Sequence, residues 1–212
     1  MTSSYNIAVL LIPLVGSLAV LLFGRKQIAV ARVLSVVTAA VVFVISWRIA
    51  AMVSGAELVH FGLSNTRHPF GLELVVDRVG ALLLLVFSGI SLVVMVFAQR
   101  LLEKEISEKN VSHYYAVYFL LLTALLAVTM SNDIFNMYIF LEVVTVSAAL
   151  LVAAKGDKLA IDAALKYLLL NMLGSGVLLM GIAGMFMGTG HLNLTEIAQA
   201  LPNAVQHFSL DI

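Results

Sequence analysis

Residues 133–154 read DIFNMYIFLEVVTVSAALLVAA, an apolar run whose interior carries a single ionisable side chain, Glu142. A helix needs about 20 consecutive apolar residues to cross a bilayer. The run therefore predicts a transmembrane helix, and it raises the question of why a carboxylate lies near its centre.

Five further apolar runs of similar character predict further transmembrane helices: Asn6–Phe23, Ala29–Val53, Gly80–Ala98, Tyr114–Met130 and Ala160–Gly188. Only Ser131, Asn132 and Asp133 separate the fourth run from the fifth, which is Asp133–Ala154. We expect a tight turn there, with Asp133 as the N-cap of the fifth helix. The sequence thus predicts an all-α integral membrane protein of about six transmembrane helices, forming one domain over residues 1–212.

The composition excludes several classes of function. The 212 residues are 62% hydrophobic and 11% charged, far from the roughly 25% charge of soluble domains. The net charge of zero gives no field for nucleic acid. With no cysteine and no ligand spacing among the histidines, we expect no metal and no cofactor. No nucleophile or phosphate-loop motif is present, so we expect no redox or hydrolytic site within the chain.

The connections between the runs predict three further features. Ser54–Val79 is too polar to span the membrane, and Ala56–Leu63 and Leu72–Val76 suggest a small hairpin outside the bilayer. Gln99–His113 has mixed charge and predicts a solvated connection with some helical charge pairing. Residues 191–212 have apolar side chains at helical spacing and predict a short interfacial helix and tail.

Lysine and arginine are concentrated in the first, third and fifth connections, at Arg25, Lys26, Arg100, Lys104, Lys109, Lys155 and Lys158. The opposite side carries mainly Arg67 and Arg78. Because cytoplasmic loops are enriched in basic residues, both termini and the hairpin are predicted to be extracytoplasmic, in a multi-pass protein of the cell membrane.

Lys166 is the counterpart of Glu142 in the sixth run. Counted from the connection near Gly156, Glu142 lies about 14 residues up one helix and Lys166 about 10 up the next, a depth difference of roughly 6 Å. Burial disfavours the charged forms and proximity favours them, so such a pair has nearly balanced protonation states. We interpret it as a proton or ion relay. A static salt bridge, or a Lys166 that extends to the interface, is the alternative.

Other polar residues of the fifth and sixth helices are candidates for lining a hydrated path: Asn136, Thr145, Ser147 and Asn171. Ordinary interhelical hydrogen bonding is their simpler role. Asp77, before the third helix, suits an N-cap. The glycines of the sixth helix favour close helix packing. They are Gly174, Gly176, Gly181, Gly184 and Gly188.

Four motifs occur in order: Leu74-Val-Val-Asp-Arg78, Asn132-Asp-Ile-Phe-Asn-Met-Tyr-Ile-Phe-Leu-Glu142, Ala164-Leu-Lys-Tyr167 and Thr189-Gly-His-Leu-Asn-Leu194. This stretch resembles antiporter-like membrane subunits of respiratory complex I and of membrane-bound hydrogenases, and especially the D subunit of Mrp-type sodium/proton antiporters. The resemblance covers roughly residues 70–195, and the first 60 residues match only in hydropathy. It implies that Glu142 is the fifth-helix glutamate of the ion-coupling axis and Lys166 the sixth-helix lysine near it.

Full-length members of that family continue for about eight more helices, with a broken seventh helix bearing a lysine and a second inverted repeat. The chain resembles the N-terminal half only, so the remainder is expected from another polypeptide or is absent. We expect an ion-translocating subunit of a multi-subunit complex, moving protons by redox-coupled pumping or by sodium/proton antiport. The alternative is a structural subunit that supplies helix contacts without transport of its own.

Overall fold

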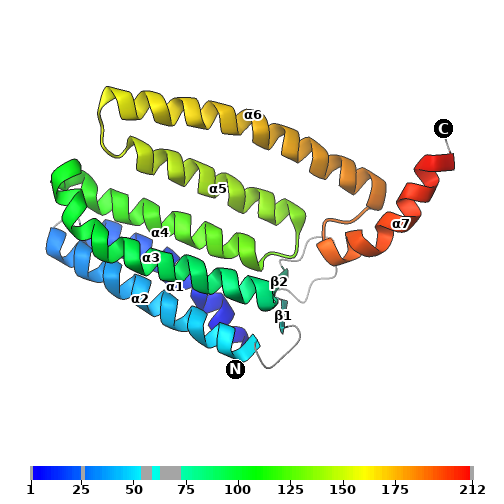
Figure 1. Cartoon of the computed structure of the whole chain (residues 1–212), viewed down its shortest axis with the longest axis horizontal. Helices are drawn as coiled ribbons and strands as arrows, with labels where there is room; N and C mark the ends of the chain where they lie inside the picture. The colour runs from blue at the N-terminus through cyan, green and yellow to red at the C-terminus, as the bar shows by residue number, and fades with distance from the viewer. Residues whose placement is uncertain (1, 25–26, 54–58, 63–72, 211–212) are drawn as a thin grey trace.

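The computed structural model describes residues 2–24, 27–53, 59–62 and 73–210. They form seven helices and two strands, in an almost entirely helical fold (Figure 1). The helices are α1 (Thr2–Phe23), α2 (Ile28–Val53), α3 (Arg78–Glu105), α4 (Glu108–Met130), α5 (Ile134–Ala153), α6 (Lys158–Thr189) and α7 (Leu194–Leu210); the strands are β1 (Val59–Gly62) and β2 (Glu73–Val76).

Five stretches of the described helices are long and apolar enough to cross a membrane: Ile28–Val53, Arg78–Leu102, Asn110–Met130, Ile134–Ala153 and Lys158–Thr189. A sixth, shorter apolar stretch of α1 covers Ile7–Phe23. The chain is therefore a multi-pass membrane protein. At 32 residues, α6 is about 48 Å long and exceeds the roughly 30 Å hydrocarbon core, so it tilts or projects beyond it.

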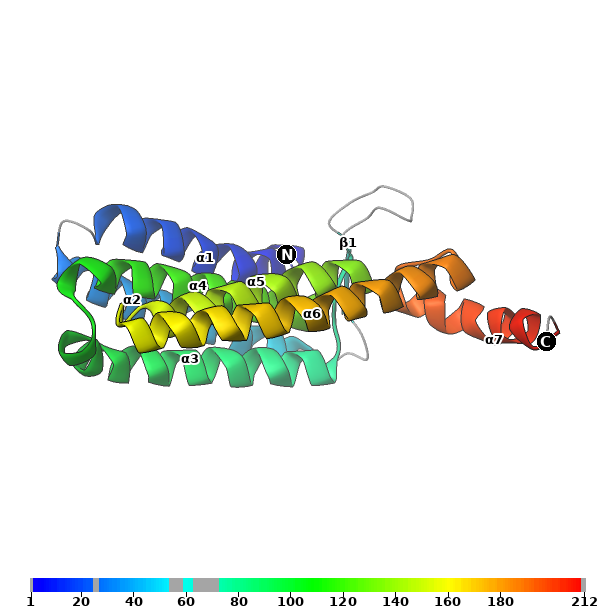
Figure 2. The same ribbon diagram turned by 90° about the horizontal axis from the view of Figure 1, so that it is seen from above.

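The helix α4 is the centre of the bundle. It packs against α1, α3 and α5, while α2 lies against α1 and α3. Its large side chains Tyr115, Phe119, Leu126 and Met130 are fully buried. The outermost helix, α6, makes its main contacts with α5 and fewer with α7. Seen from above, α7 projects beyond the end of the bundle (Figure 2).

The segment between α2 and α3 contains the two strands. They pair antiparallel, with Val59 opposite Val76 and Gly62 opposite Glu73. This pairing lies within the two runs for which a hairpin is predicted. The expected turn residues lie outside the described part of the chain, as do several charged residues of the connections: Ser64, Asn65, Pro69, Gly71, Arg25, Lys26, Arg67 and His68.

Aspartates begin three of the helices. Asp133 accepts hydrogen bonds from the backbone amides of Phe135 at 2.9 Å and Asn136 at 2.8 Å, so its predicted N-cap role is confirmed. Asp77 accepts from Gly80 N at 2.6 Å and caps α3. Asp157 caps α6 by accepting from Ala160 N at 2.7 Å. A carboxylate at these positions satisfies an amide that has no partner within its helix.

The structure refines two expectations from the sequence. The connection predicted over Gln99–His113 is mostly helical, because α3 continues to Glu105 and α4 begins at Glu108. Charged residues end a membrane span without ending a helix, and only Ile106 and Ser107 break this one. Four glycines of α6 have open space beside them in the described part of the chain: a side chain added at Gly174, Gly176, Gly181 or Gly184 would meet none of its atoms within 4 Å.

Candidate functional site

Glu142 lies on an open face of α5. Its half-buried side chain follows Phe135 and Ile139, which are 40% and 41% exposed, and precedes Val146, which is 46% exposed. The spacing of four, three and four residues places these side chains along one stripe of the helix. As the ninth residue of α5, whose bounds are Ile134–Ala153, Glu142 is close to the middle of that span.

The carboxylate of Glu142 has one close polar neighbour. Thr145 Oγ1 is 3.5 Å from Glu142 Oε2 and donates at 2.9 Å to the Glu142 carbonyl oxygen. No cation lies within ion-pair distance of Glu142 in the described part of the chain. The carboxylate is therefore free to interact with a group that reaches the open face of α5.

Lys166 lies on the face of α6 that points away from α5. Ala164 is buried, and Leu168 and Asn171 are half-buried, which marks the side that packs against α5. Lys166 is two residues from Ala164 and from Leu168, a rotation of about 200° at 3.6 residues per turn, and it is exposed. Its ammonium group is thus directed to the outer surface of the bundle.

The two ionisable groups share a depth but not a face. Glu142 is 11 residues from the end of α5 at Ala153, and Lys166 is 8 residues from the start of α6 at Lys158. At 1.5 Å per residue their heights differ by about 5 Å. Both residues are described, and they form no ion pair with each other.

The four candidates for lining a path have different surroundings. Ser147 is 1% exposed, and its hydroxyl has no hydrogen-bond partner among the described residues. The Asn171 amide donates at 2.9 Å to the Tyr167 carbonyl of its own helix. Asn136 is half-buried in the first turn of α5. Thr145 is the candidate that contacts Glu142.

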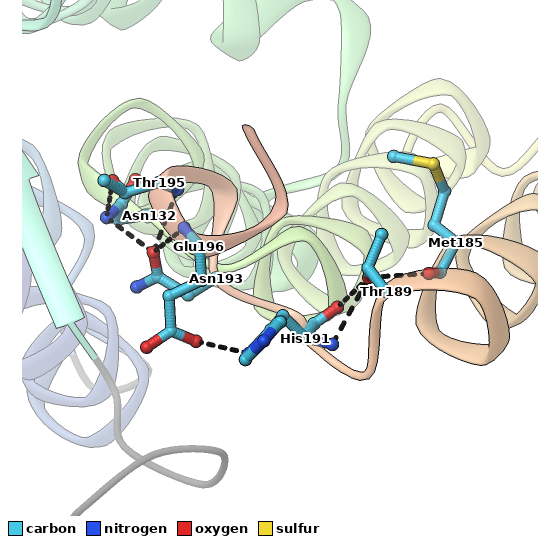
Figure 3. Close-up of polar contacts among 7 residues, drawn as sticks. All are labelled: Asn132, Met185, Thr189, His191, Asn193, Thr195 and Glu196. Atoms are coloured by element: carbon cyan, nitrogen blue, oxygen red, sulfur yellow. Dashed lines mark hydrogen bonds and ion pairs between the residues drawn. The ribbon is translucent and has the colours of Figure 1, made fainter. Parts of the chain in front are cut away.

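A polar junction at one end of α5 and α6 fixes how these helices meet (Figure 3). Asp133 and Asn193 form an isolated antiparallel β-bridge. Ile134 N donates to Leu192 O at 3.0 Å and Leu194 N donates to Asn132 O at 2.9 Å. The turn before α5 is thereby joined to the loop after α6.

Side chains of the last sequence motif organise that junction. Gly190, at φ +74°, ends α6 in the left-handed conformation that glycine adopts readily. Asn193 Oδ1 accepts hydrogen bonds from Thr195 N at 2.9 Å and from Glu196 N at 3.4 Å. It also accepts one from Asn132 Nδ2 at 3.4 Å. His191 Nδ1 is 2.9 Å from Glu196 Oε2, and Figure 3 shows this contact beside the Asn193 cluster.

Asn193 is a structural residue that the sequence reasoning missed. It is 5% exposed and caps the start of α7. The signal was present as an asparagine followed three residues later by Glu196, the spacing of a helix N-terminus.

A sequence profile described as NADH:quinone oxidoreductase/Mrp antiporter, TM matches residues 131–211. The D subunit of the Na(+)/H(+) antiporter of Bacillus subtilis (strain 168) is 27% identical over 205 residues, which are 96% of this chain and 41% of that protein. The N subunit of NADH-quinone oxidoreductase of Desulforudis audaxviator (strain MP104C) is 30% identical over 212 residues, covering 95% of this chain and 40% of that protein.

The fold is similar to one found in a solved respiratory membrane complex. A chain of the archaeal membrane-bound sulfane sulfur reductase matches with a TM-score of 0.85 at 22% identity, covering 94% of this chain and 40% of that chain. This chain therefore spans about two fifths of the length of the relatives it matches.

Proposed function

Since this chain is homologous to antiporter-like membrane subunits of the NADH:quinone oxidoreductase/Mrp antiporter group over about two fifths of their length, we propose that it is part of an ion-translocating membrane subunit. The ion is a proton, moved either by redox-coupled pumping or in exchange for sodium. The subunit works within a multi-subunit membrane assembly, with both termini and the β1–β2 hairpin extracytoplasmic and α7 at the membrane interface.

The position of Glu142 carries this proposal. A carboxylate in the middle of a span is costly when lipid surrounds it. Glu142 lies on the open stripe of α5 without a cation partner among the described residues. A hydrated cavity or a further membrane helix over that stripe would remove the cost, and either would give the carboxylate a route for exchanging its proton.

Lys166 has a separate role in the proposed mechanism. Its ammonium is directed away from α5, so it acts on Glu142 through the electrostatic potential rather than through a salt bridge. Two charges at nearly the same depth in a medium of low dielectric constant influence each other over several ångströms. When a group outside this chain approaches Lys166, the balance between charged and neutral Glu142 changes.

The alternative function is a structural subunit that supplies helix surface. The open face of α6 favours this role, because apolar residues such as Leu170, Val177 and Met187 are 72%, 70% and 87% exposed. A side chain added at Gly174, Gly176, Gly181 or Gly184 would meet no atom of the described residues within 4 Å. A face of that kind suits close approach of a partner helix. A structural role does not explain why Glu142 and Lys166 lie within the membrane spans.

The test uses Glu142→Gln and Lys166→Met in everted membrane vesicles that contain the assembled complex. Proton and sodium gradients are followed with separate fluorescent dyes, under an electron donor and then under an imposed sodium gradient. We expect Glu142→Gln to abolish ion movement and Lys166→Met to slow it. The condition that drives transport in the native complex distinguishes pumping from antiport.

The matched control is the exposed residue Lys158 at the start of α6, replaced as Lys158→Gln. It is expected to retain native transport. Subunit content is measured on each membrane preparation. Native ion movement in both Glu142→Gln and Lys166→Met contradicts the relay, and loss of partner subunits from these membranes supports the structural role instead.

A further inference from the structure

A groove of about 370 Å³ runs between α3 and α5, with α4 behind it. The α3 wall includes Val94, Phe97 and Leu101, and Tyr114 of α4 and Leu151 of α5 also line the groove. Phe97 and Leu101 are 68% and 61% exposed. Since α4 packs against both α3 and α5, it forms the floor of the groove, which is open on the side of the bundle.

One end of the groove is charged. Glu105 and Lys155 line it there, with Lys155 Nζ 3.5 Å from Glu105 Oε2. Lys155 Nζ is also 3.7 Å from Asp157 Oδ2. The side chains of Lys155, Glu105 and Asp157 are 54%, 58% and 46% exposed, so each has room for a further partner. The three groups together carry two negative charges and one positive charge.

The length of the groove corresponds to one leaflet of a bilayer. From Val94 to Glu105 the helix rises about 16 Å, whereas the hydrocarbon core is about 30 Å thick. A transmembrane helix of a partner would need a groove across both leaflets. The groove begins instead at charged residues where α3 ends and continues over apolar residues toward the membrane centre. This order matches a phospholipid, whose charged headgroup lies at the surface and whose acyl chains extend toward the centre.

We propose that this groove binds one phosphatidylethanolamine molecule. Lys155 donates to the lipid phosphate, and the primary ammonium of the headgroup donates to Glu105 and Asp157. Phosphatidylcholine has no N–H to donate, and phosphatidylglycerol adds a negative charge without bringing a further cation to the two carboxylates. One acyl chain lies along Phe97, Leu101 and Leu151. This site is independent of the proposed ion relay.

The test is native mass spectrometry of the delipidated full chain with dioleoyl-phosphatidylethanolamine, dioleoyl-phosphatidylcholine or dioleoyl-phosphatidylglycerol added singly. We expect one tightly retained phosphatidylethanolamine per chain and about tenfold weaker retention of the other two lipids. That ratio corresponds to the loss of a charge-assisted hydrogen bond. Lys155→Gln is expected to reduce phosphatidylethanolamine retention by a similar factor, while Lys158→Gln, outside the groove, leaves it unchanged.

A second pair of variants tests the apolar part. Leu101→Trp fills the groove and is expected to displace the lipid. Val93→Trp adds the same bulk at a 55% exposed position of α3 that does not line the groove, and it should not displace the lipid. Because these positions are exposed, the variants keep the fold, which thermal unfolding in detergent verifies.

Four results would overturn the proposal. Equal retention of the three lipids, or unchanged retention in Leu101→Trp, means that only ordinary surrounding lipid is present. Stronger binding of phosphatidylglycerol contradicts the headgroup assignment. Because the sequence has no cysteine, Leu101→Cys gives this chain a single thiol. A photo-crosslinker is attached to that thiol and activated in the assembled complex. Attachment to a partner subunit instead of to lipid shows that a helix occupies the groove.

Discussion

Asp133 and Asn193 lie opposite each other in a β-bridge that joins the α4–α5 turn to the α6–α7 loop. They are 6% and 5% exposed, and each also caps a helix, α5 for Asp133 and α7 for Asn193. The side chains of these two residues start two helices, and their backbone lies in the bridge that joins two distant segments of the chain.

The first prediction concerns Asp133. Asp133→Ala removes the acceptor for two backbone amides, and it is expected to lower the free energy of unfolding by about 1 kcal/mol. Asp133→Asn retains an oxygen acceptor and should cost much less. Thermal unfolding in detergent measures both, with Asp162→Ala at an exposed position of α6 as the control. Equal losses for Asn and Ala would show that capping is not the role of Asp133.

The second prediction compares two glycines. A side-chain carbon at Gly16 would lie 2.5 Å from Thr38 Cγ2, whereas one at Gly181 would meet nothing within 4 Å. Gly16→Ala should therefore push α1 away from α2 and lower the free energy of unfolding by about 1–3 kcal/mol. Gly181→Ala should stabilise the isolated chain by up to about 1 kcal/mol through helix propensity. Thermal unfolding is the measurement.

The control for the Gly16 result is the double variant Gly16→Ala with Thr38→Ala, which removes the clashing atoms. It should recover part of the lost stability relative to Gly16→Ala alone. An unchanged loss in the double variant would place the damage somewhere other than the α1–α2 contact.

The third prediction separates stability from transport at Ser147. Its buried hydroxyl has no partner in the part of the chain that the structure describes, so Ser147→Ala should leave the free energy of unfolding unchanged or raise it by about 1 kcal/mol. Ser17→Ala is the contrast, because Ser17 donates to the Ala116 carbonyl at 2.8 Å and its removal should destabilise the chain. If Ser147 lines the proposed path, ion movement in vesicles falls in Ser147→Ala without loss of protein. A destabilised Ser147→Ala would contradict the assigned surroundings.

The helices and two of their capping residues could be predicted from the sequence because their signals are local. Long apolar runs indicate spans, and aspartates before Phe135 and Gly80 indicate caps. The relation to antiporter-like subunits likewise followed from short motifs and is confirmed by the matched relatives. The extents of α3 and α4 were missed, because a helix continues into water wherever its backbone hydrogen bonds are satisfied.

The packing face of α6 could not be predicted. Its span is apolar on every side, so its sequence has no amphipathic pattern that distinguishes the face toward α5 from the outer one. The depth of Lys166 follows from counting residues, but its direction depends on which side of α6 contacts α5. The bridge between Asp133 and Asn193 was also missed, since it depends on how the helices bring two loops together.

The α5–α6 hairpin is closed at both ends, by the covalent connection at Gly156 and by the Asp133–Asn193 bridge. A piston movement of α6 along α5 by even one residue, about 1.5 Å, would break the bridge hydrogen bonds at one end and strain the connection at the other. The difference in depth between Glu142 and Lys166 is therefore fixed by the fold. Motions that alter the charge on either residue must come from side-chain rotation or from helices outside this closed frame.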